Sequence, residues 1–262
     1  LNYYAVQALI ARVALYGGDK EMAWEYADKM IRGIHEEHKW FPFVTQEEVA
    51  ATEKEDRIFQ SEILFGLYNL KRKENVYSVG FGPNLKQGSV LRIDKDIMNE
   101  MYEGDENDFR LAYWFSDMVD PDNNSYTHMI KYMDVDDLDT KTEISKGYTY
   151  IMPVLRVSEV YLIAAECCPD PKVGRDYLNA VRSVRNVKNV ADEVDLTTVI
   201  EQEFRREFLG EGQLFWLYKR KGKAEIISGE TQGKVVSMEE RFYLFDLPQS
   251  ERDYREENGI GN

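Results

Sequence analysis

Apolar side chains in the first 35 residues recur at the spacing of two helices. On the first helix the apolar positions are Tyr4, Ala8, Leu9, Ala11, Leu15 and Tyr16. Gly17, Gly18 and Asp19 then supply a C-terminal stop and an N-cap. A second helix is predicted from about Lys20 to Ile34, with Ala23, Tyr26, Ala27 and Met30 on one face. We therefore predict an αα-hairpin whose small residues let the helix axes approach closely.

The same spacing predicts a second pair of helices later in the chain. The first runs over Ser158–Glu166 and the second over Lys172–Val187, and Pro169 and Pro171 break the chain between them. The hairpins resemble tetratricopeptide units, but roughly 140 residues separate them instead of the period of about 34 in that repeat. The sequence therefore predicts tetratricopeptide-like hairpins with a long insertion, and not an uninterrupted solenoid.

The segment between the two hairpins has no sustained helical pattern. Trp40–Phe43 is an aromatic loop broken by proline, and Asn75–Gln87 is expected to form an ordered loop because it contains glycine and proline. We expect a short strand or helix over Phe59–Tyr68 and a short helix over Ile97–Tyr102. Alternation predicts a strand over Ser125–Tyr132.

The C-terminal part begins with helices and ends in short extended segments. A helical block is predicted from Thr197 to Lys219, followed by extended segments over Val235–Pro248 and a polar tail that is expected to pack on the surface. We predict a mainly α chain that forms a single domain over residues 1–262. Its parts are a helical hairpin at 1–35, a loop-rich region at 36–152, and a helical region with the C-terminal segment at 153–262.

The charge of the chain argues against a nucleic-acid partner. The net charge is -15 at pH 7, whereas binding to a phosphate backbone requires clustered cations. The two cysteines, Cys167 and Cys168, are adjacent, so long-range disulfides within the chain are excluded. No stretch approaches the ~20 apolar residues of a membrane-spanning helix. The chain opens without Met in a helical pattern, so we expect a processed or truncated protein.

No local motif indicates catalysis, a cofactor or a metal. Asp120–Asn124 offers oxygen atoms at alternate positions, but it lacks the glycine of a calcium loop and has Lys131 at the twelfth position. The acidic run Asp134–Asp139 is expected to be a solvated face. Motifs of phosphate-binding loops, nucleophilic serines and zinc proteases are missing. We predict that the protein is not an enzyme; the alternative is a glycoside hydrolase with an unmarked carboxylate pair.

The segment Glu203–Arg220 combines charged and aromatic residues on predicted helices. Arg205 and Arg206 can pair with Glu203, Glu207 and acids elsewhere, which would lock these helices to the body. The apolar anchors of this segment are Phe204, Phe208, Phe215, Trp216 and Leu217. We expect a structural role, with Trp216 buried.

This segment resembles the Glu-Arg-Arg-x-Glu-Leu-x-Phe-Glu-Gly-x-Arg-x-Trp-Asp-Leu-x-Arg motif of the SusD/RagB family of nutrient-uptake lipoproteins. Phe204 and Gly210 depart from that motif, which has Arg and Phe at these positions. Other segments resemble landmarks of the family in the same order, and these are Ala5–Asp19, Pro153–Glu166, Tyr177–Arg182 and Leu247–Glu251.

The resemblance implies a SusD-like α-α superhelix built from tetratricopeptide-like hairpins, with irregular loops that carry the ligand. It implies a protein of the outer membrane, outward-facing and lipid-anchored through an N-terminal part that this chain lacks. Members of the family bind oligosaccharides and deliver them to a TonB-dependent, SusC-like transporter. The expected partners are therefore a glycan and such a transporter, and no cofactor is expected.

Aromatic side chains in loops are candidate glycan contacts, because sugars expose apolar C–H faces along with many hydroxyl groups. Loop position and ring type select Trp40, Phe81, Tyr113, Trp114 and Tyr126. The alternative role for each of these rings is a place in the core. The alternative function for the chain is a tetratricopeptide-like adaptor that binds a partner protein in a helical groove.

Overall fold

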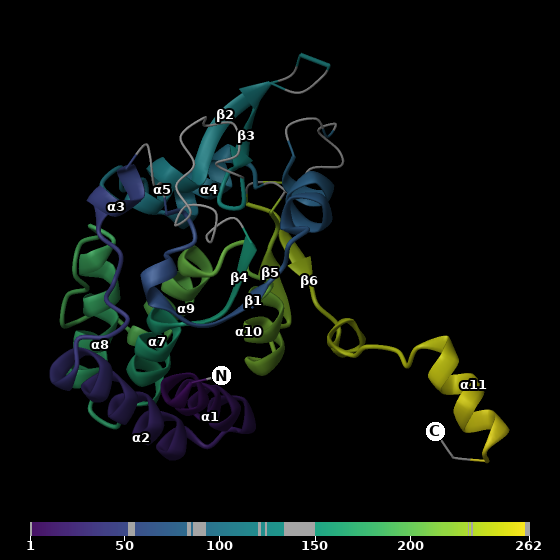
Figure 1. Ribbon diagram of the computed structural model, residues 1–262, viewed down its shortest axis with the longest axis horizontal. Coiled ribbons are helices and arrows are strands. Elements are labelled where there is room, and N and C mark those ends of the chain that lie inside the picture. The colour runs from purple at the N-terminus through teal and green to yellow at the C-terminus, as the bar shows by residue number, and fades with distance from the viewer. Residues whose placement is uncertain are drawn as a thin grey trace.

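The computed structural model describes residues 2–51, 56–82, 85, 93–119, 122–123, 125–133, 150–229, 231 and 233–259. Helices dominate these residues, and the strands are short (Figure 1). This arrangement confirms the prediction of a mainly α chain. The run Asp134–Asp139 lies outside the described residues, as do parts of Asn75–Gln87 and Asp120–Asn124.

The elements follow one another along the chain in this order. The α-helices are α1 (Tyr3–Gly17), α2 (Lys20–Ile31), α3 (Gln46–Ala50), α4 (Lys95–Met101), α5 (Phe109–Trp114), α7 (Val157–Cys167), α8 (Pro171–Val184), α9 (Leu196–Glu207), α10 (Leu214–Arg220) and α11 (Gln249–Glu257). The π- and 3₁₀-helices are η1 (Arg32–Glu37), η2 (Gln60–Glu62), η3 (Lys73–Phe81) and η6 (Glu240–Tyr243). The strands are β1 (Ile63–Tyr68), β2 (Phe115–Val119), β3 (Ser125–Met129), β4 (Ile151–Arg156), β5 (Glu225–Ile227) and β6 (Val235–Ser237).

The α1–α2 hairpin forms where the sequence predicts it. The side chain of Asn2 accepts a hydrogen bond from the Ala5 amide and caps α1, and Asp19 caps α2 by the same kind of bond. Gly18 ends α1 with a φ of 84°, a left-handed conformation that suits glycine. Buried alanines face each other across the hairpin, and α7 packs against both helices. The resulting core continues through α8 and α9.

The second predicted hairpin is formed by α7 and α8. Asp170 caps α8, and Pro171 occupies the first turn, where the missing N–H costs no helical hydrogen bond. The two helices approach closely at Gly174, because a Cβ there would lie 2.9 Å from the Ala165 carbonyl oxygen. Helix α9 packs against both α7 and α8.

The segment between the hairpins builds a second hydrophobic cluster, whose buried rings include Phe59, Phe109, Trp114 and Tyr132. Beside it, β2 and β3 pair antiparallel, which confirms the strand predicted over Ser125–Tyr132. Lys73–Phe81 forms helix η3, so the expectation of a loop over Asn75–Gln87 is wrong for residues 75–81. The physical reason is that η3 turns Tyr77 and Phe81 into the cluster.

Strand β1 pairs antiparallel with β4, with Ile63 opposite Arg156. The predicted segment Phe59–Tyr68 is therefore mainly a strand. The pairing also brings Glu62, which ends η2, beside the start of α7. This position matters because Glu62 joins the two hydrophobic clusters through buried arginines.

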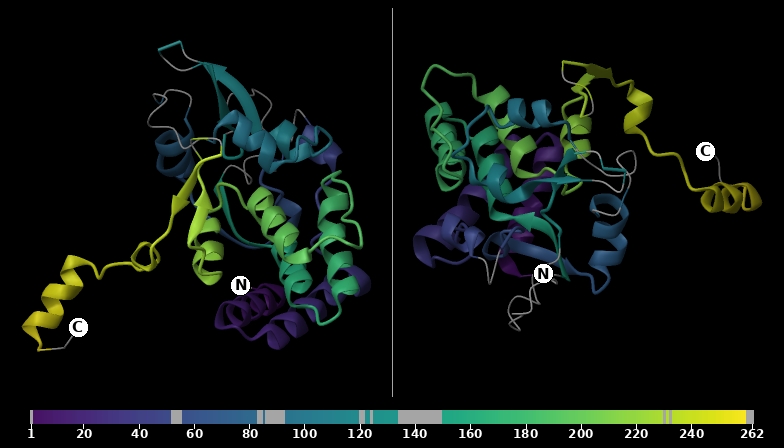
Figure 2. Two further views of the ribbon diagram at one scale, coloured as in Figure 1. Left: turned by 180° about the vertical axis from the view of Figure 1, so that it is seen from behind. Right: turned by 90° about the horizontal axis from the view of Figure 1, so that it is seen from above.

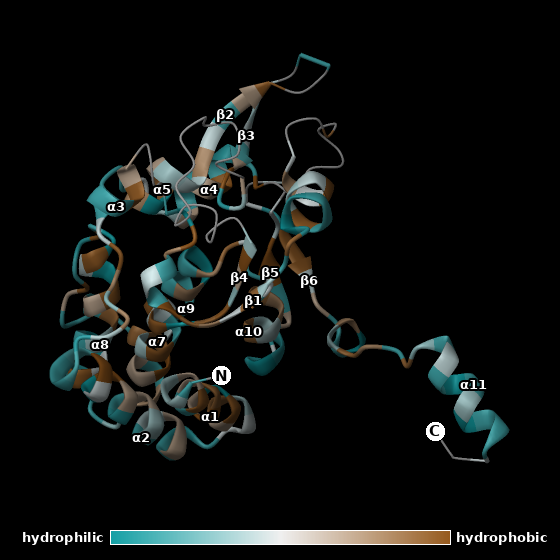
Figure 3. Ribbon diagram, in the orientation of Figure 1, coloured by the Kyte–Doolittle hydropathy of each residue, from teal (hydrophilic) through white to brown (hydrophobic). Residues whose placement is uncertain are grey.

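The C-terminal segment leaves the body of the molecule (Figures 1 and 2). No residue of α11 is buried, so the expectation that the polar tail packs on the surface is wrong. The helix is hydrophilic along its length (Figure 3), and its burial would therefore remove little apolar surface from water. The stretch before it is apolar, and Leu244 and Phe245 are exposed there.

Candidate functional site

Trp40 lies after the first hairpin in a loop with an uncommon backbone conformation. Its neighbours Lys39 and Phe41 have positive φ angles of 53° and 50°, which cost of order 1 kcal/mol each for residues other than glycine. The Trp40 amide donates a 2.7 Å hydrogen bond to the Ile34 carbonyl and ties the loop to η1. This backbone leaves the indole ring 53% exposed.

The rings around Trp40 form an aromatic surface, which we call the Trp40 surface and define by Tyr3, Tyr4, His38, Lys39 and Trp40. The His38 and Trp40 rings are stacked, with centroids 4.6 Å apart. The Tyr4 ring meets the indole edge-on at 5.6 Å, and Tyr3 is 63% exposed. These residues, except His38, border an open hollow of about 540 Å³. The surface therefore offers ring faces beside an amine.

The sequence points to Trp40 but not to Tyr3, Tyr4 or His38. In an antiparallel hairpin the start of the first helix lies beside the end of the second. The predicted hairpin thus already implied that the tyrosines at the start of α1 approach the loop after η1, as the Tyr4–Trp40 contact shows. Hairpin geometry was the signal that could have found them.

Trp114 is a fully buried member of the second cluster. Its indole stacks on the Phe59 ring at 5.0 Å, and its Nε1 donates a 2.8 Å hydrogen bond to the Arg57 carbonyl. Lys131 lies over the Trp114 ring, with Nζ 3.8 Å from the ring centroid. These contacts give Trp114 a packing role.

The other candidate rings lie away from the Trp40 surface. Tyr126 is buried on β3 beside His128, and Phe81 is buried at the end of η3. Tyr113 is half-buried and packs against the second cluster. The structure therefore brings three candidates, Phe81, Tyr113 and Trp114, to one cluster and leaves Trp40 apart from them.

Helix α9 carries the centre of a buried ion network. Glu207 binds Arg110, Arg156 and Arg185 at distances between 2.6 and 2.8 Å, and none of these side chains is more than 1% exposed. Burial alone would raise the pKa of Glu207, but Arg185 and Arg156 outweigh it and hold the pKa well below its usual range. The carboxylate therefore stays ionised and paired.

The same network extends along the motif segment. Glu203 binds Arg110 at 2.8 Å and Arg182 at 2.9 Å, and Glu211 binds Arg156 at 2.8 Å. These bonds confirm the expected structural role of the segment. Arg206 pairs with Glu203 at 3.5 Å as expected, but the expected ion pair of Arg205 is wrong, because within the described residues its side-chain partner is the Tyr218 hydroxyl. They connect the helices of the first core to the elements of the second cluster.

Trp216 departs from the expectation of burial, which is wrong: the side chain is 43% exposed, whereas Leu217 is only 2% exposed. Neighbouring residues on a helix point about 100° apart, so the burial of Leu217 turns Trp216 outward. Its ring meets those of Phe215 and Phe245 at 5.2 and 5.9 Å. The indole thus lies in a surface cluster of rings.

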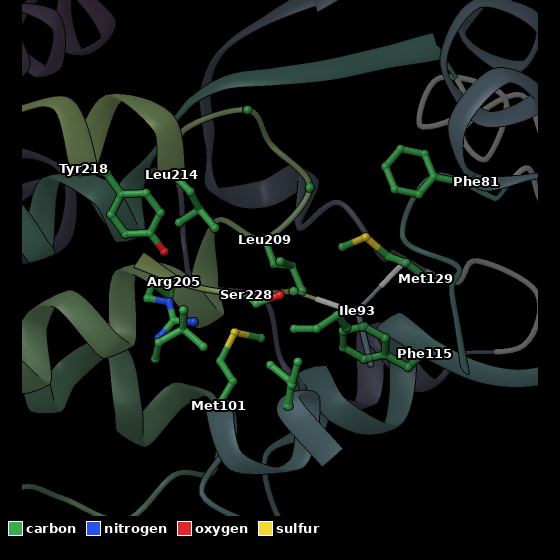
Figure 4. A pocket seen from close by; sticks show the side chains of 15 residues that line it. Phe81, Ile93, Met101, Phe115, Met129, Arg205, Leu209, Leu214, Tyr218 and Ser228 are labelled. Atoms are coloured by element: carbon green, nitrogen blue, oxygen red, sulfur yellow. The ribbon is translucent and has the colours of Figure 1, made fainter. Parts of the chain in front are cut away.

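A second concave site, which we call the apolar pocket, has a volume of about 520 Å³ (Figure 4). It lies between α4, the β2–β3 hairpin, the connection from α9 to α10, and β5. The residues that line it are Phe81, Ile93, Ile97, Met101, Phe115, Met129, Arg205, Leu209, Gly210, Gly212, Leu214, Tyr218, Ile227, Ser228 and Gly229. Arg205 is the only guanidinium among them.

Within the described ranges, no group of three or more His, Cys, Asp or Glu residues is arranged to hold a metal ion. No helix in the described part of the chain is long and apolar enough to cross a membrane.

Comparison with known families gives a match over most of the chain. The model of the SusD family matches residues 14–255. The chain belongs to the SusD family. A search among curated proteins gave no significant match.

Solved SusD-family structures share the fold of this chain. A SusD superfamily protein from Bacteroides thetaiotaomicron has a TM-score of 0.69 and 24% identity, covering 97% of this chain and 59% of its own. A SusD-like carbohydrate binding protein from Bacteroides vulgatus has a TM-score of 0.67 and 15% identity, with coverages of 98% and 59%. A laminarin binding SusD-like protein has a TM-score of 0.57 and 19% identity, with coverages of 85% and 55%.

The chain thus spans 59% of the length of the first two of these structures. In this SusD-family chain the motif segment forms the ion network and is structural. The exposed Trp40 surface lies outside that segment.

Proposed function

We propose that this SusD-family chain binds a glycan and that the Trp40 surface contacts it. The observation that carries the proposal is the exposure of Trp40 and Tyr3 beside the amine of Lys39, around one hollow. An indole face covers the C–H face of a sugar ring, while the amine binds its hydroxyls. The names of two structural neighbours, carbohydrate binding and laminarin binding, support a carbohydrate as the ligand class.

Among the five candidate rings, we retain Trp40 as the ligand contact. Trp114 is fully buried, and Phe81 and Tyr126 are nearly so. A ring in the core can reach a sugar only after the surrounding side chains have moved. Tyr113 is half-buried, so we rank it after Trp40 as a ligand contact.

We further propose that the bound glycan passes to a TonB-dependent, SusC-like transporter of the outer membrane. The whole protein would face outward, held by a lipid anchor outside residues 1–262. Membership of the SusD family supports both steps. The proposed function is binding without hydrolysis. Glu203 and Glu207 of the motif are buried and held ionised by arginines, which argues against these two residues as a general acid.

Affinity gel electrophoresis against a panel of polysaccharides, beginning with laminarin, tests the glycan proposal. We expect at least one polysaccharide to retard the unmodified protein and Trp40→Ala to weaken that binding about tenfold, equivalent to about 1.4 kcal/mol. Trp216→Ala is the matched control, because it removes an exposed indole outside the Trp40 surface. An unchanged affinity of Trp40→Ala, or an equal loss in both variants, would contradict the assignment.

The competing functions predict different results. A tetratricopeptide-like adaptor would ignore the whole panel and bind a peptide. A glycoside hydrolase would release reducing sugar, and one carboxylate substitution would abolish that release. The transporter step predicts that a SusC-like protein co-purifies with the native protein from detergent-solubilised outer membranes, and its consistent absence would contradict that step.

A further inference from the structure

The apolar pocket is separate from the Trp40 surface and differs in chemistry. Its volume of about 520 Å³ suits a small organic molecule. Met101, Phe115, Met129 and Leu214 supply apolar surface (Figure 4), and Gly210 contributes a wall without a side chain. A glycan would find few partners for its hydroxyl groups on such walls. An apolar molecule would be removed from water on several sides.

Arg205 brings a single cation into this apolar lining. In Figure 4 the Tyr218 hydroxyl points toward its guanidinium, and the two side chains interact. Within the described part of the chain, no carboxylate forms an ion pair with Arg205, and its Nε is buried without a hydrogen-bond partner. The residue next to it, Arg206, is ion-paired within the buried network. Glu201, one turn earlier on α9, is bound by Lys223 at 2.8 Å.

Arg205 lines the pocket, so an anion bound there would give its guanidinium a charged partner and form charge-assisted hydrogen bonds. The net charge of the chain is -15, so an anionic ligand requires such a local cation.

We propose that the apolar pocket binds a small molecule with an apolar body and one anionic group, a carboxylate or sulfonate, that is received by Arg205. The apolar walls select the body, and Arg205 selects the charge and sets the orientation. The site is independent of the glycan proposal, and Trp40→Ala leaves it unchanged.

A pair of fluorescent probes tests both parts of this proposal. 1-Anilinonaphthalene-8-sulfonate carries the anion, and N-phenyl-1-naphthylamine has the same ring framework without it. We expect Arg205→Met to weaken sulfonate binding about tenfold or more, the effect of one charge-assisted contact, and to leave the affinity for the neutral probe unchanged. Ile227→Trp, at an exposed position on the pocket wall, should weaken the binding of both probes.

Controls separate the pocket from other apolar surface. Phe245→Ser alters the exposed C-terminal stretch and should leave the affinities for both probes unchanged. Circular dichroism of each variant confirms folding, and Arg205→Gln replaces Arg205→Met if the latter does not fold. The proposal is overturned by equal sulfonate affinity in the unmodified protein and the Arg205 variant, by parallel loss of both probes in that variant, or by loss of binding in Phe245→Ser.

Discussion

Arg185 and Glu62 form a buried bidentate ion pair across 123 residues of sequence, with Nη1–Oε1 and Nη2–Oε2 distances of 2.8 and 2.7 Å. Both side chains are fully buried. Arg185 follows α8 of the second hairpin, whereas Glu62 ends the turn before β1. This pair therefore binds the helical scaffold to the segment between the hairpins. Arg185 also forms an ion pair with Glu207, at an Nη2–Oε1 distance of 2.8 Å.

Removal of one partner from this pair should be strongly destabilising. Glu62→Gln leaves Arg185 and Arg156 with less negative charge in a site without solvent, and we expect a loss of about 3–5 kcal/mol in the free energy of unfolding. Urea denaturation measures it. The control is Asp117→Asn, which breaks an exposed pair with Lys95 and should change stability by less than about 1 kcal/mol. Similar losses in the two variants would show that the ion pairs of Glu62 are not the main connection between the helical scaffold and the segment between the hairpins.

Adjacent residues of α10 should differ sharply in their contribution to stability. Leu217→Ala empties a buried position and should cost about 2–5 kcal/mol, whereas Trp216→Ala removes a half-exposed ring and should cost about 1 kcal/mol. Thermal unfolding of both variants gives the comparison. A larger loss for Trp216 than for Leu217 would mean that the ring cluster with Phe215 and Phe245 is packed more firmly than its exposure indicates.

Local sequence patterns were sufficient for the two hairpins, because caps, small residues and turns act within a few positions. Gly18 and Asp19 end one helix and begin the next, and Asp170 with Pro171 begins α8. The motif segment likewise indicated its own structural role, since several of its charges pair within one helix turn or with neighbouring helices.

Long-range contacts determine which aromatic and charged side chains are buried, and local sequence patterns do not predict these contacts. Whether a ring such as Trp114 faces solvent depends on Phe59 and Lys131, which approach it only in the folded chain. The sequence predicts a loop position for both Trp114 and Trp40, but Trp114 ends helix α5, so the expected loop position did not separate the two rings. The sequence also could not show that Arg205 has no carboxylate partner among the described residues, because Glu201, one turn earlier on α9, is bound by Lys223.

Alanine at Gly174 should destabilise the protein, although alanine favours helices by about 1 kcal/mol over glycine. A Cβ at Gly174 would lie 2.9 Å from the Ala165 carbonyl oxygen, so α7 and α8 would have to separate. Gly17 in α1 is the matched control, since its Cβ would meet no atom within 4 Å. We expect a lower melting temperature for Gly174→Ala and an equal or higher one for Gly17→Ala. Stabilisation by both substitutions would contradict the close contact between α7 and α8.

Asp56 should make stability fall as the pH rises. The side chain is buried, and its Oδ2 accepts a 2.7 Å hydrogen bond from the Gln60 amide. Burial raises the pKa of Asp56 to about 6 from 3.8, and the Gln60 amide opposes the shift. Because the folded carboxyl holds its proton more tightly, its contribution is fully present below pH 3.8 and is lost as the pH passes about 6.

Asp56→Asn should remove this loss. Relative to the unmodified protein, the variant should gain up to about 3 kcal/mol in unfolding free energy between pH 4 and pH 7, since each pKa unit corresponds to about 1.4 kcal/mol. Urea denaturation at intervals of one pH unit measures the difference. Asp195 is the control of opposite sign: hydrogen bonds from Thr198 lower its pKa, so the effect of Asp195→Asn should vary only below about pH 4. A constant difference between Asp56→Asn and the unmodified protein across this range would show that Asp56 is ionised as readily in the folded chain as in water.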